Sequence, residues 1–156
     1  NNRISCRIID LLILEQHQAH MCHVGDTRLY KYKGGVLTKL SRDQSLVGLQ
    51  EDAGILSEEE AKSHPRRNII TRFIGNARLD WNTNYMMNLS FPIENDAQYL
   101  MCSDGLYDMV ASAEIMEVLA QESDLQQKVE LLMHRANLAG GKDNITAIIL
   151  EIKKII

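Results

Sequence analysis

The chain has 156 residues, of which 45% are hydrophobic and 24% are charged, and this composition is typical of a globular protein about one domain in size. Its formal net charge of -4 disfavours a broad basic surface for nucleic acid or anionic lipid. No apolar run approaches the roughly 20 residues of a membrane span, and the three cysteines lack C-x-x-C spacing, which favours reduced thiols. We therefore expect one cytoplasmic domain over residues 1–156 that binds neither nucleic acid nor a membrane.

The first quarter of the chain predicts a β-meander. Apolar and β-branched residues run almost without interruption before a polar turn, and alternating residues follow it. Gly34 and Gly35 then supply a hairpin turn. The expected strands are 4–14, 19–24, 27–33 and 36–41.

The next segment is polar and irregular, with two helices expected inside it. Ser57 and Glu60 have the spacing of a capping box for a short helix, which Pro65 would end. The apolar residues of "NIITRFI" predict a second helix over 68–74, ended by Gly75.

The second half of the chain predicts two strands, two helices and a last strand. The strands are expected at 84–93 and 97–103, and the helices at 112–120 and 124–139, where apolar residues recur three and four apart. A serine or an aspartate stands ready to cap each helix. After Gly140 and Gly141 the chain returns to a strand at 144–152, so the fold class is α+β.

Three aspartates stand at the ends of predicted strands. Asp104 follows one apolar strand and Asp143 precedes another, and the two would face each other if these strands are antiparallel neighbours. Asp26 follows a third strand and a glycine. Crowded carboxylates repel one another unless a cation lies between them, and Mg²⁺ or Mn²⁺ prefers such oxygen ligands. On this interpretation Gly105 lets the backbone turn away from the ion.

Plainer interpretations of the same residues stay open. An Asp-Gly pair after a strand is most often an ordinary turn. His17, His20 and His23 have an H-x-x-H-x-x-H spacing, but this spacing alternates faces along a strand and does not converge on a zinc ion. The serine before Asp104 lacks the glycine of a hydrolase nucleophile elbow.

Four motifs in order resemble a known family. "HVGDTRLYKY", "LTKLSRDQSL", "YLMCSDGLYDMV" and "GGKDNITAIIL" are similar to motifs of the metal-dependent serine/threonine protein phosphatases of type 2C, particularly the compact bacterial ones. The resemblance runs from about residue 4 to residue 152. Residues 42–75 resemble the mobile flap of these enzymes, and Gln44 stands where the family often has histidine.

The resemblance implies an α-β-β-α sandwich of two antiparallel sheets flanked by helices, with a centre of two or three Mn²⁺ or Mg²⁺ ions. By position, Asp104 and Asp143 correspond to ligands of the first ion, and Asp26 with Asp104 to ligands of the third. The implied reaction is hydrolysis of phosphoserine and phosphothreonine in proteins by a metal-activated water, without a phosphoenzyme. A cognate Ser/Thr kinase is a partner expected from the family alone.

The chain also departs from the family pattern. The family carries an Asp-Gly-x-x-Gly motif whose aspartate bridges two ions, but the only Asp-Gly here is Asp104-Gly105. We therefore expect an N-terminally incomplete fold, the C-terminal two thirds of a catalytic domain, with little activity of its own. The alternative is a non-catalytic, phosphatase-like regulatory or binding module. Arg66, Arg67 and Arg72 of the flap-like segment are candidates for substrate contact.

Overall fold

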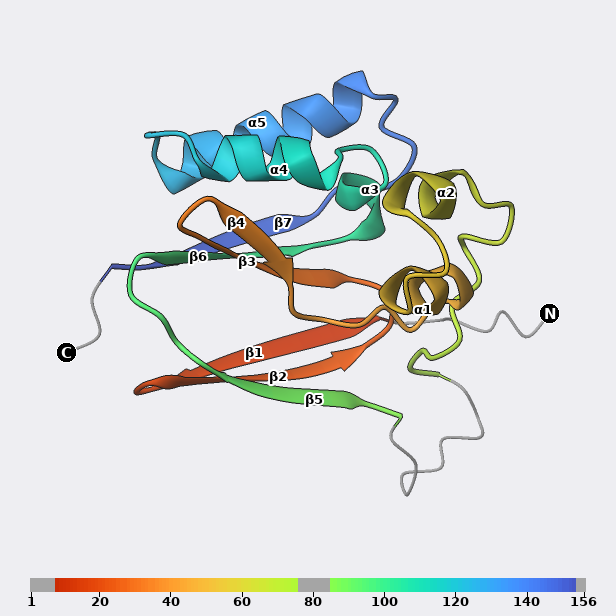
Figure 1. The fold of residues 1–156 in the computed structure, drawn as a ribbon, viewed down its shortest axis with the longest axis horizontal. Helices are drawn as coiled ribbons and strands as arrows, with labels where there is room; N and C mark the ends of the chain where they lie inside the picture. The colour runs from red at the N-terminus through yellow and green to blue at the C-terminus, as the bar shows by residue number, and fades with distance from the viewer. Residues whose placement is uncertain (1–7, 76–84, 154–156) are drawn as a thin grey trace. The chain divides into compact units, whose positions relative to one another are not determined.

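The computed structural model describes residues 8–75 and 85–153. Parts of two predicted strands, residues 4–7 and 84, lie outside the described residues. The chain divides into two compact units, one of residues 1–26 and 42–92 and the other of residues 27–41 and 93–156. Each unit contains one antiparallel sheet (Figure 1).

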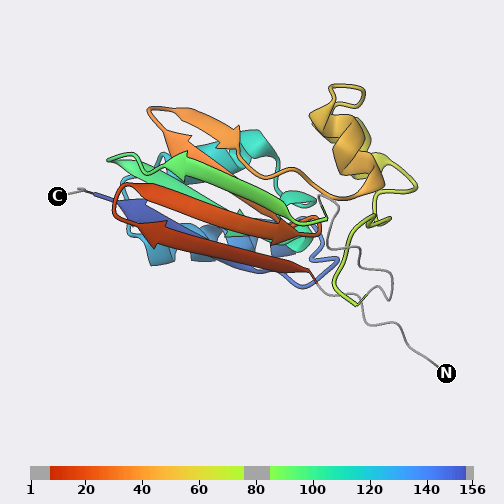
Figure 2. The same cartoon turned by 90° about the horizontal axis from the view of Figure 1, so that it is seen from below.

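The first unit contains a three-stranded sheet in the order β1-β2-β5. Its strands are β1 (Ile9–Glu15), β2 (Gln18–Val24) and β5 (Met87–Pro92), which lie side by side in Figure 2. The hairpin between β1 and β2 turns at Gln16, whose φ is 47°. One face of β1 remains apolar and open to solvent, since Leu11 is 52% exposed and Ile13 is 50% exposed.

Two short helices complete the first unit. Helix α1 (Leu46–Asp52) was not predicted, although the Ser45 hydroxyl caps it by accepting a hydrogen bond from the Gly48 amide at 2.9 Å. Helix α2 (Glu58–Ser63) has the predicted capping box, in which the Ser57 and Glu60 side chains each bind the other's main-chain amide. This helix ends at Ser63, two residues before the proline, as expected.

The helix predicted over 68–74 is wrong. This stretch forms no helix, and its residues 69–71 pair with residues 44–46. The Leu46 amide donates to the Ile69 carbonyl, and Ser45 forms an isolated bridge with Ile70. Tertiary pairing therefore takes the main-chain groups that a helix would have used within itself, and the β-branched residues of this stretch favour the extended form.

The second unit contains a four-stranded sheet in the order β4-β3-β6-β7. Its strands are β3 (Arg28–Lys33), β4 (Val36–Lys39), β6 (Ala97–Cys102) and β7 (Ala147–Ile152). The predicted glycine turn joins β3 to β4, with positive φ at Gly34 and Gly35. Strand β6 pairs antiparallel with β7, and Cys102 lies opposite Ala147.

Three helices belong to the second unit: α3 (Asp104–Tyr107), α4 (Ser112–Leu119) and α5 (Leu125–Leu138). Asp124 caps α5 as predicted, accepting from the Gln127 amide at 2.8 Å. The serine expected to cap α4 is instead its first residue, and the Glu114 carboxylate accepts from the Ala111 amide at 3.0 Å. Helices α4 and α5 pack with strands β6 and β7 around one core of the unit. The largest fully buried apolar side chains of this core are Leu100, Leu106, Ile115, Leu119 and Leu132.

Two antiparallel sheets with helices confirm the predicted α+β class. None of the helices in residues 8–75 and 85–153 is long and apolar enough to cross a membrane.

Candidate metal centre

Asp104 and Asp143 lie at the same end of two neighbouring strands, as the sequence predicted. Asp104 begins α3 two residues after the end of β6, and Asp143 lies four residues before β7 begins. Because β6 and β7 are antiparallel, the end of one and the start of the other share an edge of the sheet. Each carboxylate accepts a hydrogen bond from the amide of the next residue, at 2.9 Å for Asp104 and 2.7 Å for Asp143.

Ser103 ties the two acidic segments together. Its hydroxyl donates to the Asn144 carbonyl at 3.1 Å and accepts from the Thr146 amide at 3.0 Å. Its own amide donates to the Thr146 carbonyl at 3.1 Å. Three hydrogen bonds from the residue before Asp104 therefore fix the residues that follow Asp143.

Gly105 allows these segments to approach closely. A Cβ at this position would lie 2.4 Å from the Asn144 carbonyl oxygen and 3.3 Å from that of Asp143. The sequence interpretation of Gly105 as a turn residue is wrong. Gly105 lies inside helix α3 and does not have a positive φ. Its small size is what matters here.

The electrostatics of this edge suit a cation. Burial raises the pKa of the Asp104 carboxyl, and the nearby charge of Asp143 raises it further, against the lowering effect of the Gly105 amide. Two carboxylates that disfavour each other's charge gain stability when a divalent cation lies between them. Their oxygen atoms are the donor type that Mg²⁺ and Mn²⁺ prefer, so this pair fits the implied metal.

Asp26 belongs to the first unit and is buried, with 5% of its surface exposed. It follows Gly25, whose φ of +126° and whose tight contact with Ile8 leave no room for a side chain. Within residues 8–75 and 85–153, no group of three or more His, Cys, Asp or Glu side chains could hold a metal ion by itself. Asp104 and Asp143 by themselves would supply only part of the ligands that a metal ion needs.

The second unit also braces the helix that carries Asp104. The Arg28 guanidinium lies 3.9 Å from the centre of the Tyr107 ring and donates to the Tyr30 hydroxyl at 3.2 Å. The arginine is buried, so the ring face replaces part of its hydration. Neither Arg28 nor Ser103 was singled out as a site residue from the sequence, although Ser103 directly precedes Asp104 and Arg28 lies two residues after Asp26.

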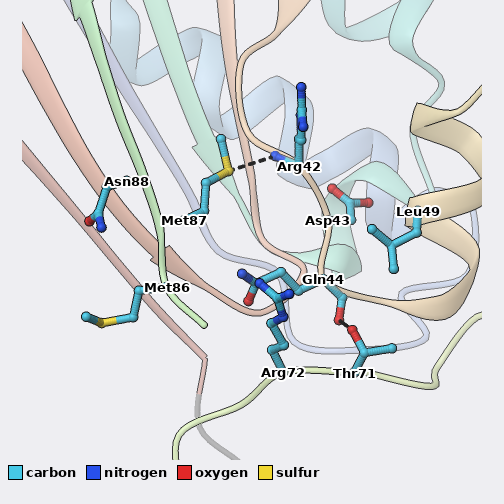
Figure 3. Close-up of a pocket in the computed structure, with 9 residues that line it drawn as sticks. All are labelled: Arg42, Asp43, Gln44, Leu49, Thr71, Arg72, Met86, Met87 and Asn88. Carbon is cyan, nitrogen blue, oxygen red and sulfur yellow. Dashed lines mark hydrogen bonds between the residues drawn. The ribbon is translucent and has the colours of Figure 1, made fainter. Parts of the chain in front are cut away.

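The arginines of the flap-like segment are separated. Arg66 is exposed and Arg67 is half-buried beyond helix α2. Arg72 lines a cavity of about 690 Å³ in the first unit, shown in Figure 3, together with Arg42, Gln44 and Met87. The structure therefore gives Arg72 a defined cavity and leaves Arg66 on the surface.

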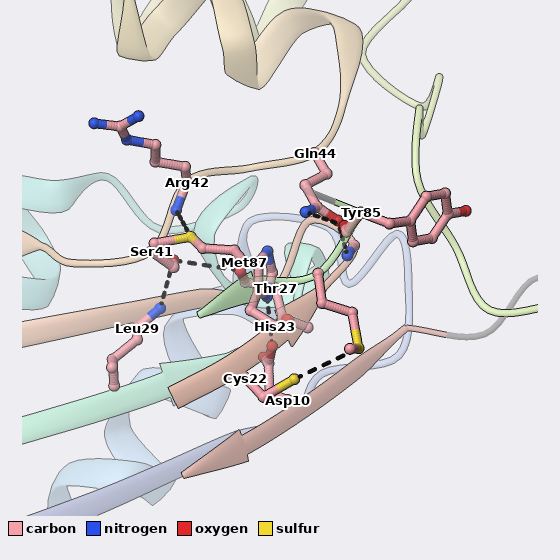
Figure 4. A network of polar contacts seen from close by, with 12 residues as sticks. Asp10, Cys22, His23, Thr27, Leu29, Ser41, Arg42, Gln44, Tyr85 and Met87 are labelled. Carbon is pink, nitrogen blue, oxygen red and sulfur yellow. Dashed lines mark hydrogen bonds and ion pairs between the residues drawn. The ribbon is translucent and has the colours of Figure 1, made fainter. Parts of the chain in front are cut away.

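The histidines take separate structural roles. The buried His23 pairs with Asp10 across strands β2 and β1 (Figure 4). His20 is half-exposed on the other face of β2 and bonds to the Ser90 hydroxyl at 2.9 Å. His20 and His23 therefore lie on opposite faces of β2, as expected from the alternation of side chains along a strand.

The chain is similar to known proteins over most of its length. The serine/threonine phosphatase stp of Listeria innocua is 36% identical over 140 residues, which are 89% of this chain and 54% of that protein. The chain is related to the bacterial serine/threonine phosphatases of type 2C. The resemblance inferred from the four motifs is thereby confirmed.

Solved structures agree with this relationship. The serine/threonine phosphatase Stp1 of Staphylococcus aureus has a TM-score of 0.84 and 28% identity, covering 94% of this chain and 56% of that one. The catalytic domain of the phosphatase PstP, solved in complex with two manganese ions, has a TM-score of 0.79 over 94% of this chain and 59% of that one, and its 24% identity supports the fold alone. No family model matches the chain. The chain spans about half the length of the curated relatives that it matches.

Proposed function

We propose that this chain is part of an enzyme that removes phosphate from phosphoserine and phosphothreonine of proteins in a metal-dependent reaction. The observation that carries the proposal is the position of Asp104 and Asp143 at one sheet edge, where burial first and the nearby charge of Asp143 second raise the pKa of the Asp104 carboxyl. The named phosphatases among the relatives favour this function over a non-catalytic binding module.

The residues of the chain would act mainly by position. Asp104 and Asp143 would hold one divalent ion between them, and Asp26 with Asp104 would hold another. Such ions, when bound, activate a water molecule and neutralise the charge that develops on a phosphoryl group. Ser103 and Gly105 would keep the two carboxylates of the sheet edge at a fixed separation. Metal binding would then not have to offset the entropy cost of ordering a mobile site.

The remaining functional assignments follow from this proposal. The ions would be Mn²⁺ or Mg²⁺, two or three of them in the complete domain. Arg66, Arg67 and Arg72 would contact the phosphoprotein substrate, with Arg72 the best placed because it lines a cavity. The cognate kinase and the cytoplasmic location stay predictions.

Calorimetric titration of the chain with Mn²⁺ tests the proposal. The variants Asp104→Asn and Asp143→Asn keep the side-chain size but remove one ligand charge, so both should lose the specific heat of binding. Asp96→Asn is the matched control. Asp96 directly precedes the first residue of β6, at the end of the strand away from Asp104, and it has a positive φ that asparagine tolerates.

Hydrolysis of p-nitrophenyl phosphate, assayed on the same samples, distinguishes a catalytic phosphatase from a chain that binds metal without catalysis. Binding that both site variants lose and the control keeps would support the metal site, and turnover would extend it to catalysis. A folded wild-type chain that binds no Mn²⁺ would contradict a metal site formed by these residues in this chain.

A further inference from the structure

The geometry points to Gln44 as a positioning residue, which holds the turn before Asp26 and ties that turn to the flap-like segment (42–75). This inference rests on the proposed function, since it takes Asp26 to be a metal ligand. It also explains the role of glutamine at a position where the type 2C phosphatases often have histidine.

Both main-chain polar groups of Gly25 form hydrogen bonds with Gln44. The Gly25 amide donates to Oε1 of Gln44 at 2.9 Å, and the Gln44 amide donates to the Gly25 carbonyl at 2.7 Å. Gly25 itself has a φ of +126° and a contact with Ile8 that no side chain could share. The backbone that leads into Asp26 is thus held in a glycine-only conformation by one partner residue.

Gln44 also forms hydrogen bonds with two other segments of the chain. Its Nε2 donates to the Tyr85 carbonyl at 3.0 Å (Figure 4). The main-chain carbonyl of Gln44 accepts from the Thr71 amide at 2.7 Å and from the Thr71 hydroxyl at 2.6 Å (Figure 3). A residue with only 5% of its surface exposed therefore joins three segments that are distant in sequence: the Asp26 turn, the end of the flap-like segment and the approach to β5.

The chemistry of the amide fits both of its partners at once. The Gly25 amide requires an acceptor and the Tyr85 carbonyl requires a donor, and a carboxamide presents one of each. A glutamate of the same size offers acceptors only, so its second oxygen would face a carbonyl oxygen. Leaving buried groups without partners is costly. A neutral histidine also presents one acceptor and one donor, which makes it the natural conservative replacement.

The link predicts that the Asp26 turn and the flap-like segment respond together. Loss of the amide should free the Gly25 N–H and loosen residues 69–71, which pair with 44–46. The backbone that leads into Asp26 would then be less constrained. Removal of such outer partners of ligands typically weakens metal binding about 10- to 100-fold.

The test compares the full chain with Gln44→Met, Gln44→Glu and Gln44→His. Gln126→Met is the matched control, because Gln126 is exposed on helix α5 and bonds only to Glu130 in the next turn. Two quantities are measured on each protein: the hydrogen-exchange rates of the Gly25, Asp26 and Thr71 amides, and the Mn²⁺ affinity by calorimetry.

We expect Gln44→Met and Gln44→Glu to speed exchange at all three amides and to weaken Mn²⁺ binding about tenfold or more. Gln44→His should stay nearer to the wild type in both measurements, and Gln126→Met should match the wild type. Unchanged exchange at Gly25 in a folded Gln44→Met chain would overturn the inference, and so would faster exchange with Mn²⁺ affinity intact, since Gln44 would then be structural only. A wild-type chain that fails to bind Mn²⁺ would instead contradict the proposed metal site itself, and that failure appears before any variant is compared.

Discussion

The carbonyl oxygen of Asn144 occupies the space that a side chain on residue 105 would need, only 2.4 Å from the position of a Cβ. A main-chain atom held by the Ser103 hydroxyl at 3.1 Å has little freedom to withdraw. The distance between the two acidic segments therefore depends on a glycine and a serine that flank Asp104 on either side.

Gly105→Ala should push the Asp143 segment away from helix α3. We expect a loss of about 1–3 kcal/mol in the free energy of unfolding, as for other overpacked sites, together with weaker Mn²⁺ binding. Urea unfolding and calorimetry on one preparation measure both effects. Gly54→Ala is the control: its positive φ also makes alanine unfavourable, but no atom lies within 4 Å of its Cβ position. Equal Mn²⁺ affinity in the two variants would argue against Gly105 as a spacer.

Ser103→Ala should remove the hydroxyl that bonds both Asn144 and Thr146. The expected cost is about 1 kcal/mol of unfolding free energy, and Mn²⁺ affinity should fall as the Asp143 segment loosens. Ser103→Thr keeps the hydroxyl, so it should restore most of the affinity. If the threonine variant binds Mn²⁺ no better than the alanine variant, the hydroxyl does not organise the site.

The His23 and Asp10 pair should make stability depend on pH. Burial alone would lower the pKa of the His23 imidazole, but its hydrogen bond to Asp10 and the charges of Asp10 and Asp43 outweigh burial and raise the pKa above 6.5. Protonated His23 is therefore favoured by folding, so its stabilisation is complete below the unfolded pKa and is lost as pH rises through the folded value.

Asp10→Asn removes the charged partner and should lower the pKa of His23. Unfolding free energies measured from about pH 5 to 9 should then fall less steeply with rising pH than in the wild type, and the imidazole signal of His23 should titrate at lower pH. His17→Gln, in the exposed turn between β1 and β2, should leave the slope as it is. A wild-type slope in Asp10→Asn would refute the role of the pair.

Ser57→Ala should destabilise the flap-like segment. The serine caps helix α2 through the capping box, and loss of such a cap costs about 1 kcal/mol. Trypsin should then cleave faster after Arg66 and Arg67, because local opening lets the backbone of the segment enter the protease active site. Glu59→Ala changes the same helix outside the capping box and should alter cleavage much less. Identical cleavage rates in the two variants would count against the cap.

Most strands, both long helices and the shared sheet edge of Asp104 and Asp143 could be predicted from the amino-acid sequence alone. These features depend on local signals: alternation of apolar residues, capping residues, glycine turns and the order of motifs along the chain. The Asp104–Asp143 pair was predictable because antiparallel pairing of two sequence-evident strands leaves little choice about which ends meet.

Three other features depend on contacts between residues that are distant in sequence. Residues 68–74 have the apolar pattern of a helix, but residues 69–71 pair with residues 44–46 and no helix forms. Gly105 was expected to turn the chain, whereas its role is to admit the Asn144 carbonyl. Gln44 gave no local signal of its function, because its partners Gly25, Thr71 and Tyr85 are distant in sequence. In each case the deciding contact joins residues that no short sequence window contains together, so packing across the fold overrides or supplies what local propensity leaves open.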